Sequence, residues 1–235
     1  MALPRVNTPD YTLELPSTGE KIKYRPFLVK EQKILMMAQD TKDETQLADA
    51  MGTLVSSCTY GTLDASTSPL FDIEYVFLKI RSKSVGSKVD LMVVCPDDEK
   101  TQAKVSLDLD DINVTMTDDH INEVQVNDKV KVVFRYPILH DLKGLTKNPT
   151  DVDRVFHVLN RCISEIHFGD DVYQRKEITE DEVKTFVDDL TGEQFDKLVD
   201  FFGSMPKLRH VINITNPKTK VKSEVVLEGL ESFLG

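Results

Sequence analysis

Carboxylate side chains form the densest group of chemically active residues in this sequence. The stretch from Val105 to Asp128 contains no lysine or arginine and seven acids, which are Asp108, Asp110, Asp111, Asp118, Asp119, Glu123 and Asp128. A calcium loop would need acids at alternate positions, a glycine at position six and a glutamate at position twelve. Neither Asp108 nor Asp111 begins such a register. The stretch is therefore interpreted as a solvated sheet face with acidic turns, or as a docking surface for a basic partner.

Metal and nucleophile chemistry has little support in the pattern of histidines and cysteines. The five histidines are isolated, and no HExxH, GxSxG or glycine-rich phosphate loop occurs. Cys95 precedes Pro96 as at the start of a zinc knuckle, but Asp97 and Asp98 follow where a second thiolate would be needed. We therefore expect no metal, no cofactor and no enzymatic activity. A hydrolase that uses the acidic stretch is the least favoured class, because the acids lack placed His, Lys or Tyr partners.

The three cysteines, Cys58, Cys95 and Cys162, are an odd number spread along the chain. This is not the arrangement of a disulfide framework, and it indicates a reducing compartment. Cys58 and Cys162 lie on the apolar stripes of predicted helices. Both are interpreted as small core residues.

Two groups of apolar residues are candidates for binding a partner protein. Met36 and Met37 widen the apolar surface of a predicted helix, and methionine adapts to many surfaces, although a core position is favoured for them. Leu230 and Phe233 belong to an apolar segment, 225–234, near the end of the sequence. We rank that segment first as the docking element of a chaperone, because terminal segments are often ordered only by a partner.

Composition excludes several classes of protein. The 235 residues include 40 acidic and 29 basic ones, for a net charge of −11, which disfavours nucleic-acid binding. No apolar run approaches the ~20 residues that a bilayer crossing needs, and residues 1–10 do not resemble a secretory signal peptide. The length allows one large domain or two small ones.

Periodicity predicts an α+β fold. Alternation around a turn at Pro16–Gly19 predicts a hairpin, and helices are expected at 28–39, 47–58 and 69–85, with Ser68 as the N-cap of the third. Residues 87–136 alternate with period two and predict a central antiparallel sheet of three to five strands. We found no internal repeat. Residues 1–139 are thus expected to form one α+β region.

The second half is predicted to be mainly helical. Residues 140–150 form a candidate linker, and residues 151–235 form the C-terminal region. An apolar stripe runs through 152–166. Thr179 with Glu182 and Thr191 with Gln194 form capping boxes at two short helices. A terminal hairpin is expected around 216–218, followed by a short apolar helix.

Two segments, residues 22–38 and 69–86, carry a family resemblance. They read Ile-Lys-Tyr-Arg-Pro-Phe-Leu-Val-Lys-Glu-Gln-Lys-Ile-Leu-Met-Met-Ala and Pro-Leu-Phe-Asp-Ile-Glu-Tyr-Val-Phe-Leu-Lys-Ile-Arg-Ser-Lys-Ser-Val-Gly. In this order and spacing they resemble the baseplate hub subunit and hub assembly family of T-even-type contractile-tailed phages. The resemblance covers roughly residues 10–165.

The resemblance implies a tail protein that acts by protein–protein interaction. A hub subunit or hub assembly factor would bind other tail and baseplate hub proteins, and the tape-measure protein is a further candidate partner. The alternative is a tail or tape-measure assembly chaperone that is absent from the mature virion. The expected location is the tail baseplate of the virion, or the host cytoplasm during assembly, without nucleic-acid or membrane binding.

Overall fold

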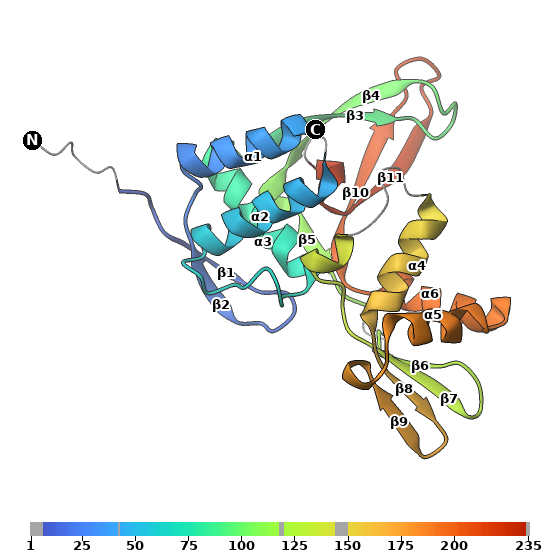
Figure 1. Ribbon diagram of the computed structural model, residues 1–235. Coiled ribbons are helices and arrows are strands. Elements are labelled where there is room, and N and C mark those ends of the chain that lie inside the picture. The colour runs from blue at the N-terminus through green and yellow to red at the C-terminus, as the bar shows by residue number, and fades with distance from the viewer. Residues whose placement is uncertain (1–6, 42, 118–119, 144–149, 234–235) are drawn as a thin grey trace, which may run out of the picture. The chain divides into compact units, whose positions relative to one another are not determined.

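The structure is a computed structural model that describes residues 7–41, 43–117, 120–143 and 150–233. The chain forms two compact units, one made of residues 1–115 and 207–235 and the other of residues 116–206. We call them unit 1 and unit 2. Both combine helices with small antiparallel sheets (Figure 1), so the predicted α+β class is confirmed.

Unit 1 begins with the predicted hairpin, β1 (Tyr11–Glu14) and β2 (Lys21–Tyr24), whose strands pair antiparallel. Three helices follow, which are α1 (Val29–Thr41), α2 (Glu44–Cys58) and α3 (Leu70–Val85). The structure places Pro69 rather than Ser68 at the N-cap of α3. The helix ends at Val85, and its C-cap residue Gly86 has a φ of 108°, which glycine adopts readily but which strains other residues.

Two small sheets complete unit 1. β3 (Lys88–Val94) pairs with β4 (Gln102–Asp108), and the second sheet has the order β11-β10-β5. Its strands are β5 (Asn113–Thr115), β10 (Lys207–Thr215) and β11 (Lys222–Glu228). Two 3-10 turns, η1 (Leu109–Asp111) and η4 (Leu230–Phe233), follow β4 and β11. The hairpin, α2, α3 and these sheets share one apolar core.

Unit 2 contains a four-stranded sheet of order β6-β7-β8-β9. The strands are β6 (Glu123–Gln125), β7 (Val130–Phe134), β8 (Ile163–Phe168) and β9 (Asp171–Gln174). The helical elements are η2 (Leu139–Leu142), α4 (Asp151–Cys162), η3 (Arg175–Glu177), α5 (Glu180–Asp188) and α6 (Gly192–Ser204). Both predicted capping boxes are present, since Thr179 and Thr191 accept from the backbone N–H of Glu182 and Gln194. The helices and sheet enclose a second apolar core.

The predicted central sheet at 87–136 does not form as one sheet. Its strands belong to three sheets, which are β3-β4, the β5 edge of β11-β10-β5, and β6-β7 within unit 2. Alternation identifies which face of a strand is buried, but it does not specify the pairing partner. The region 151–235 is also less helical than predicted, because it contains β8 and β9. The predicted terminal hairpin around 216–218 is confirmed, since β10 and β11 pair antiparallel on either side of it.

The two units do not follow the predicted division at 140–150. β10 pairs with β5 and also contacts α3, so the C-terminal hairpin belongs to unit 1. The candidate linker falls inside the residues of unit 2, and its residues 144–149 lie outside the described part of the chain. A strand pairing between positions almost 100 residues apart, such as Leu208 with Val114, has no local signature in the sequence.

Candidate functional site

Asp110 of the acidic stretch is bound by side chains of α3. Lys83 Nζ lies 2.6 Å from Asp110 Oδ2, and Ser82 Oγ donates to Asp110 Oδ1 at 2.7 Å. The hydrogen bond from Lys83 is the main reason why the pKa of Asp110 lies below its usual range. The acidic stretch has no basic residue of its own, but the fold pairs Asp110 with Lys83, and Lys131 lies 2.9 Å from Glu123.

A buried lysine holds the turn that carries this acid. Lys79 is 7% exposed, and its Nζ donates to the carbonyl oxygens of Leu109, Asp110 and Ile112 at 3.2, 2.8 and 2.8 Å. Burial lowers the pKa of Lys79, and the carboxylate of Asp110 opposes that effect. The turn η1 is therefore fixed to α3 by Lys79, so its acids have a structural role within unit 1.

The remaining acids of the predicted docking surface differ in their surroundings. Asp108 is half-buried and accepts the backbone N–H of Asp110 at 3.0 Å. Asp111 is exposed, whereas Asp118 and Asp119 lie outside the described residues. Of the described acids of this predicted surface, Asp110 and Asp111 are exposed, and Asp110 is already paired with Lys83.

The methionine pair of α1 faces solvent. Met36 and Met37 are 58% and 59% exposed, so the core position favoured for them is wrong. The helix instead buries Glu31 and Ala38. The two methionines stay candidates for docking a partner.

Leu230 and Phe233 lie in the core of unit 1 and not on its surface. They are 7% and 0% exposed, and both belong to the cluster that includes Ile73 and Leu78 of α3. The expectation that this segment is a free docking element is therefore corrected. The turn η4 closes the core, and its apolar residues are not available to a partner in this structure.

The cysteines behave as core residues. Cys58, Cys95 and Cys162 are all buried and free of disulfides. Burial raises the pKa of Cys58 to about 11 and that of Cys162 to about 12. Their thiols are thus protonated at neutral pH, which makes them poor nucleophiles.

One histidine of unit 2 lies beside a serine. His120 Nδ1 is 3.0 Å from Ser204 Oγ, and its ring stacks on Tyr136. The Ser204 hydroxyl is also within hydrogen-bond distance of the carbonyl oxygens of Asp200 and Phe201. The buried Nε2 of His120 lacks a hydrogen-bond partner, whereas a catalytic histidine is usually oriented by a third group at this position. The pair resembles a packed polar contact more than an activated nucleophile.

Two further searches cover the described part of the chain. No group of three or more His, Cys, Asp or Glu residues there is arranged to hold a metal ion. None of the helices described combines the length and apolar character that a bilayer crossing needs.

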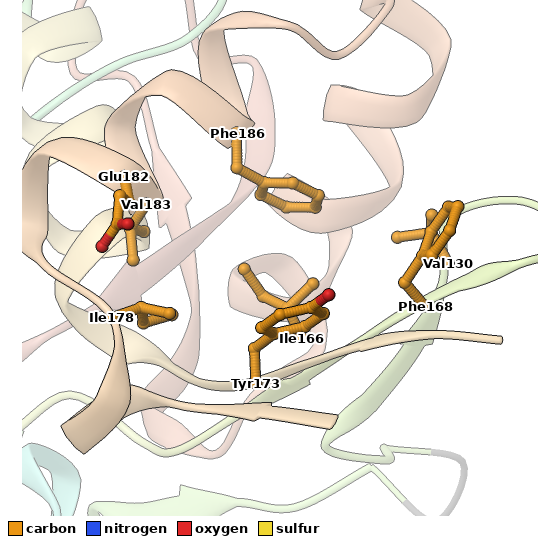
Figure 2. Close-up of a pocket in the computed structure, with 8 residues that line it drawn as sticks. All are labelled: Val130, Ile166, Phe168, Tyr173, Ile178, Glu182, Val183 and Phe186. Carbon is orange, nitrogen blue, oxygen red and sulfur yellow. The ribbon is translucent and has the colours of Figure 1, made fainter. Parts of the chain in front are cut away.

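An apolar cleft lies in unit 2 between its sheet and α5 (Figure 2). Its volume is about 250 Å³, and its lining is almost entirely apolar. Phe168 and Tyr173 remain 52% and 45% exposed at its edge. The lining residues are Val130, Ile166, Phe168, Tyr173, Ile178, Glu182, Val183 and Phe186.

The period-two alternation of the strands and the 3.6-residue period of α5 bring these side chains together around the cleft. Ile166 and Phe168 alternate onto one face of β8, and Tyr173 of β9 lies opposite Ile166 in the register. Phe186 faces them from α5 (Figure 2). Glu182 is the acid of the cleft and accepts from Thr179 N at 2.7 Å, a bond that lowers its pKa. The cleft therefore combines aromatic anchors with one fixed negative charge.

Sequence reasoning missed this cleft because it assigned Ile166 to the stripe of the preceding helix. The structure ends α4 at Cys162 and begins β8 at Ile163. A signal was present in Gly169-Asp170, a two-residue turn in which Gly169 has a φ of 61°. Such a turn between β-formers indicates a hairpin and would have placed Phe168 on a strand.

The described geometry defines an α+β protein with exposed apolar surfaces and buried thiols. Residues 8–235 match the family model described as T4 bacteriophage base plate protein, and the chain belongs to this family. No curated protein and no solved structure gives a significant match. The resemblance found in the sequence is thus confirmed for the T4-type base plate. Membership implies a place in the phage tail and contact with other base plate proteins.

Proposed function

We propose that this protein is a hub subunit or hub assembly factor of the base plate and acts by binding other hub proteins. The cleft of unit 2 is the observation that carries the proposal. Exposed aromatic side chains around an apolar hollow are typical of the centre of a protein interface. Half-exposed Phe168 and Tyr173 would become buried by a partner side chain that enters the cleft.

Replacement of Phe168 by serine tests this role, with Val172→Ser as the matched control. The two residues are similarly exposed, at 52% and 46%, but Val172 lies opposite His167 and so faces the other side of the sheet. We expect Phe168→Ser to reduce co-purification with base plate proteins from infected cells, and Val172→Ser to preserve it. Equal retention of both variants would exclude the cleft as the binding site.

The alternative is a tail or tape-measure assembly chaperone that does not remain in the virion. The exposed pair Met36 and Met37 favours it, because flexible methionines suit transient partners. Quantitative mass spectrometry of purified tails separates the two roles. Stoichiometric copies support a hub subunit, whereas presence in assembling cells but not in tails supports a chaperone in the host cytoplasm.

We further propose that the protein works without catalysing a reaction. The protonated thiols of Cys58 and Cys162 and the packed contact between His120 and Ser204 support this view. Ser204→Ala provides the test, because base plate assembly in infected cells should be unchanged by removal of this hydroxyl. A defect in assembly with an unchanged thermal melt would instead favour a catalytic role for the pair of His120 and Ser204.

A further inference from the structure

Unit 1 contains a buried arginine–carboxylate pair directly after β2. Arg25 Nη2 lies 3.0 Å from Glu31 Oε1, six residues further on, and Glu31 Oε2 accepts the backbone N–H of Leu28 at 2.7 Å. The backbone N–H of Arg25 donates to the carbonyl oxygen of Cys58, the last residue of α2, at 3.0 Å. Glu31 is 4% exposed. The pair thus joins the end of a strand, a helix start and a helix end.

Unit 2 contains the same arrangement directly after β7. Arg135 binds Asp141, again six residues further on, at 2.6 and 2.9 Å, and Asp141 Oδ2 accepts the backbone N–H of Ile138 at 2.9 Å. The backbone N–H of Arg135 donates to the carbonyl oxygen of Cys162, the last residue of α4, at 2.9 Å. Asp141 is 2% exposed. Each hydrogen bond described in unit 1 therefore has a counterpart in unit 2.

The preceding hairpins match as well. Leu13 pairs with Ile22 in unit 1, and Val124 pairs with Val132 in unit 2. If Arg25 is aligned with Arg135, β2 coincides with residues 131–134 of β7, and Ile22 and Val132 are both buried. Although the sequence pattern revealed no internal repeat, we infer from these matched contacts that the units share a repeated structural module of hairpin, arginine–carboxylate pair, and helix ending in cysteine.

The two modules differ at one edge of the hairpin. In unit 2 the chain continues from Cys162 into β8, which pairs with β7. In unit 1 the chain turns away after Cys58, where Tyr60 and Gly61 have φ values of 57° and 74°. Among the described residues no strand pairs with the second edge of β2.

The backbone groups at this edge belong to Lys21 and Lys23. The bond from Leu15 N to Glu20 O fixes which pairs of the hairpin exchange hydrogen bonds, so Ile22 and Tyr24 face β1 while Lys21 and Lys23 face the other way. No described backbone group bonds to Lys21 or Lys23 on that side. Since buried backbone groups are nearly always paired, these groups are expected to face water.

The repeated module indicates what kind of segment would cover the open edge of β2 in an assembly. In unit 2 the occupant is a strand antiparallel to β7, and its Glu165 lies opposite Val133, the counterpart of Lys23. The exposed side chains of Lys21 and Lys23 favour acids at these positions of an incoming strand. We propose that an extended segment of another base plate protein, acidic at alternate positions, pairs antiparallel with β2. This proposal rests on the proposed role in base plate assembly.

Amide hydrogen exchange of the isolated protein gives the first test. The amides of Lys21 and Lys23 should exchange quickly, whereas those of Ile22 and Tyr24 should exchange slowly because they are bonded to β1. Lys131 of β7 provides the internal reference for an occupied edge. Equally slow exchange of Lys21, Lys23 and Lys131 would overturn the proposal, because the chain would then cover its own edge.

The second test uses proline on either edge of the same hairpin. Lys23→Pro blocks pairing at the proposed edge, and Thr12→Pro is the matched control, since Thr12 lies opposite Lys23 and its N–H faces away from β2. We expect Lys23→Pro to lower incorporation into purified base plate fractions by about tenfold or more, and Thr12→Pro to preserve it. Equal incorporation, or equal loss, would overturn the proposal.

Two outcomes separate this proposal from the proposed function. If both proline variants enter base plates as the unmodified chain does, the edge is not used and the function stands. If the unmodified chain never associates with base plate proteins, both fail. Should Lys23→Pro melt at a lower temperature than Thr12→Pro, exchange mass spectrometry of the unmodified chain in base plate fractions decides, because Lys21 and Lys23 must become protected there.

Discussion

Glu74 of α3 should make unit 1 less stable as the pH rises. Its carboxylate accepts the backbone N–H of Leu230 in η4, and burial raises its pKa from 4.5 to about 7. The nearby carboxylate of Glu231 raises it further, whereas the bond from Leu230 opposes the shift. At pH values above about 7, Glu74 therefore carries a negative charge in surroundings that favour its neutral form.

The sign and size follow from the two pKa values. Between pH 4.5 and about 7 the folded protein keeps a proton that the unfolded chain releases, so stability falls as the pH rises. The full cost, on the order of 3 kcal/mol, is present at pH values above 7. The Glu74→Gln variant keeps an acceptor for the Leu230 N–H but removes the charge. It should therefore be more stable than the wild type by roughly this amount at about pH 8, and by much less at about pH 5.

Urea unfolding followed by far-UV circular dichroism measures this difference at both pH values, since the chain has no tryptophan. If the two units unfold separately, the transition that moves must be that of unit 1, which exchange mass spectrometry of α3 identifies. Glu231→Gln is the control and should have a smaller effect. A Glu74→Gln variant that is no more stable than the wild type at the higher pH, or equally more stable at both, would refute the reasoning.

Three further predictions concern the core and its supports. Phe233→Ala should destabilise unit 1 by roughly 3–5 kcal/mol, measured by urea unfolding, because the side chain is fully buried; an unchanged midpoint would contradict its place in the core. Lys79→Met should cost about 3 kcal/mol in the same assay, since three carbonyl oxygens lose their donor; retention of full stability would show that water replaces it. The thiols of Cys58, Cys95 and Cys162 should react with a disulfide reagent only after urea is added, and rapid native labelling would contradict their burial.

Local signals predicted local structure well. The hairpin at Tyr11–Tyr24 and the capping boxes at Thr179 and Thr191 were predictable, because each depends on residues within a few positions of one another. β8 was missed because Ile163 and Ile166 continue the helical spacing of α4. What decides their conformation is the ladder to β7, about 30 residues earlier in the sequence.

The candidate site was harder to predict for the same reason. Asp110 appeared unpaired because its cation, Lys83, comes from a helix and lies 27 residues earlier in the sequence. The burial of Phe233 depends on α3, far away in the sequence. Residue type identified Asp110 as a charged residue and Phe233 as an apolar one. Whether each side chain is paired or buried depends on long-range packing, which periodicity does not encode.

The return of β10, β11 and η4 to unit 1 has a consequence for the order in which a ribosome can produce a folded chain. All residues of unit 2, 116–206, are synthesised before the strand β10 that joins β5. Unit 2 can therefore close its core while unit 1 still waits for Leu208, Leu230 and Phe233. The hairpin with its open edge is synthesised early, yet the core beneath it is completed last. A partner that binds unit 1 only after its core is complete would therefore distinguish completed chains from nascent or truncated ones.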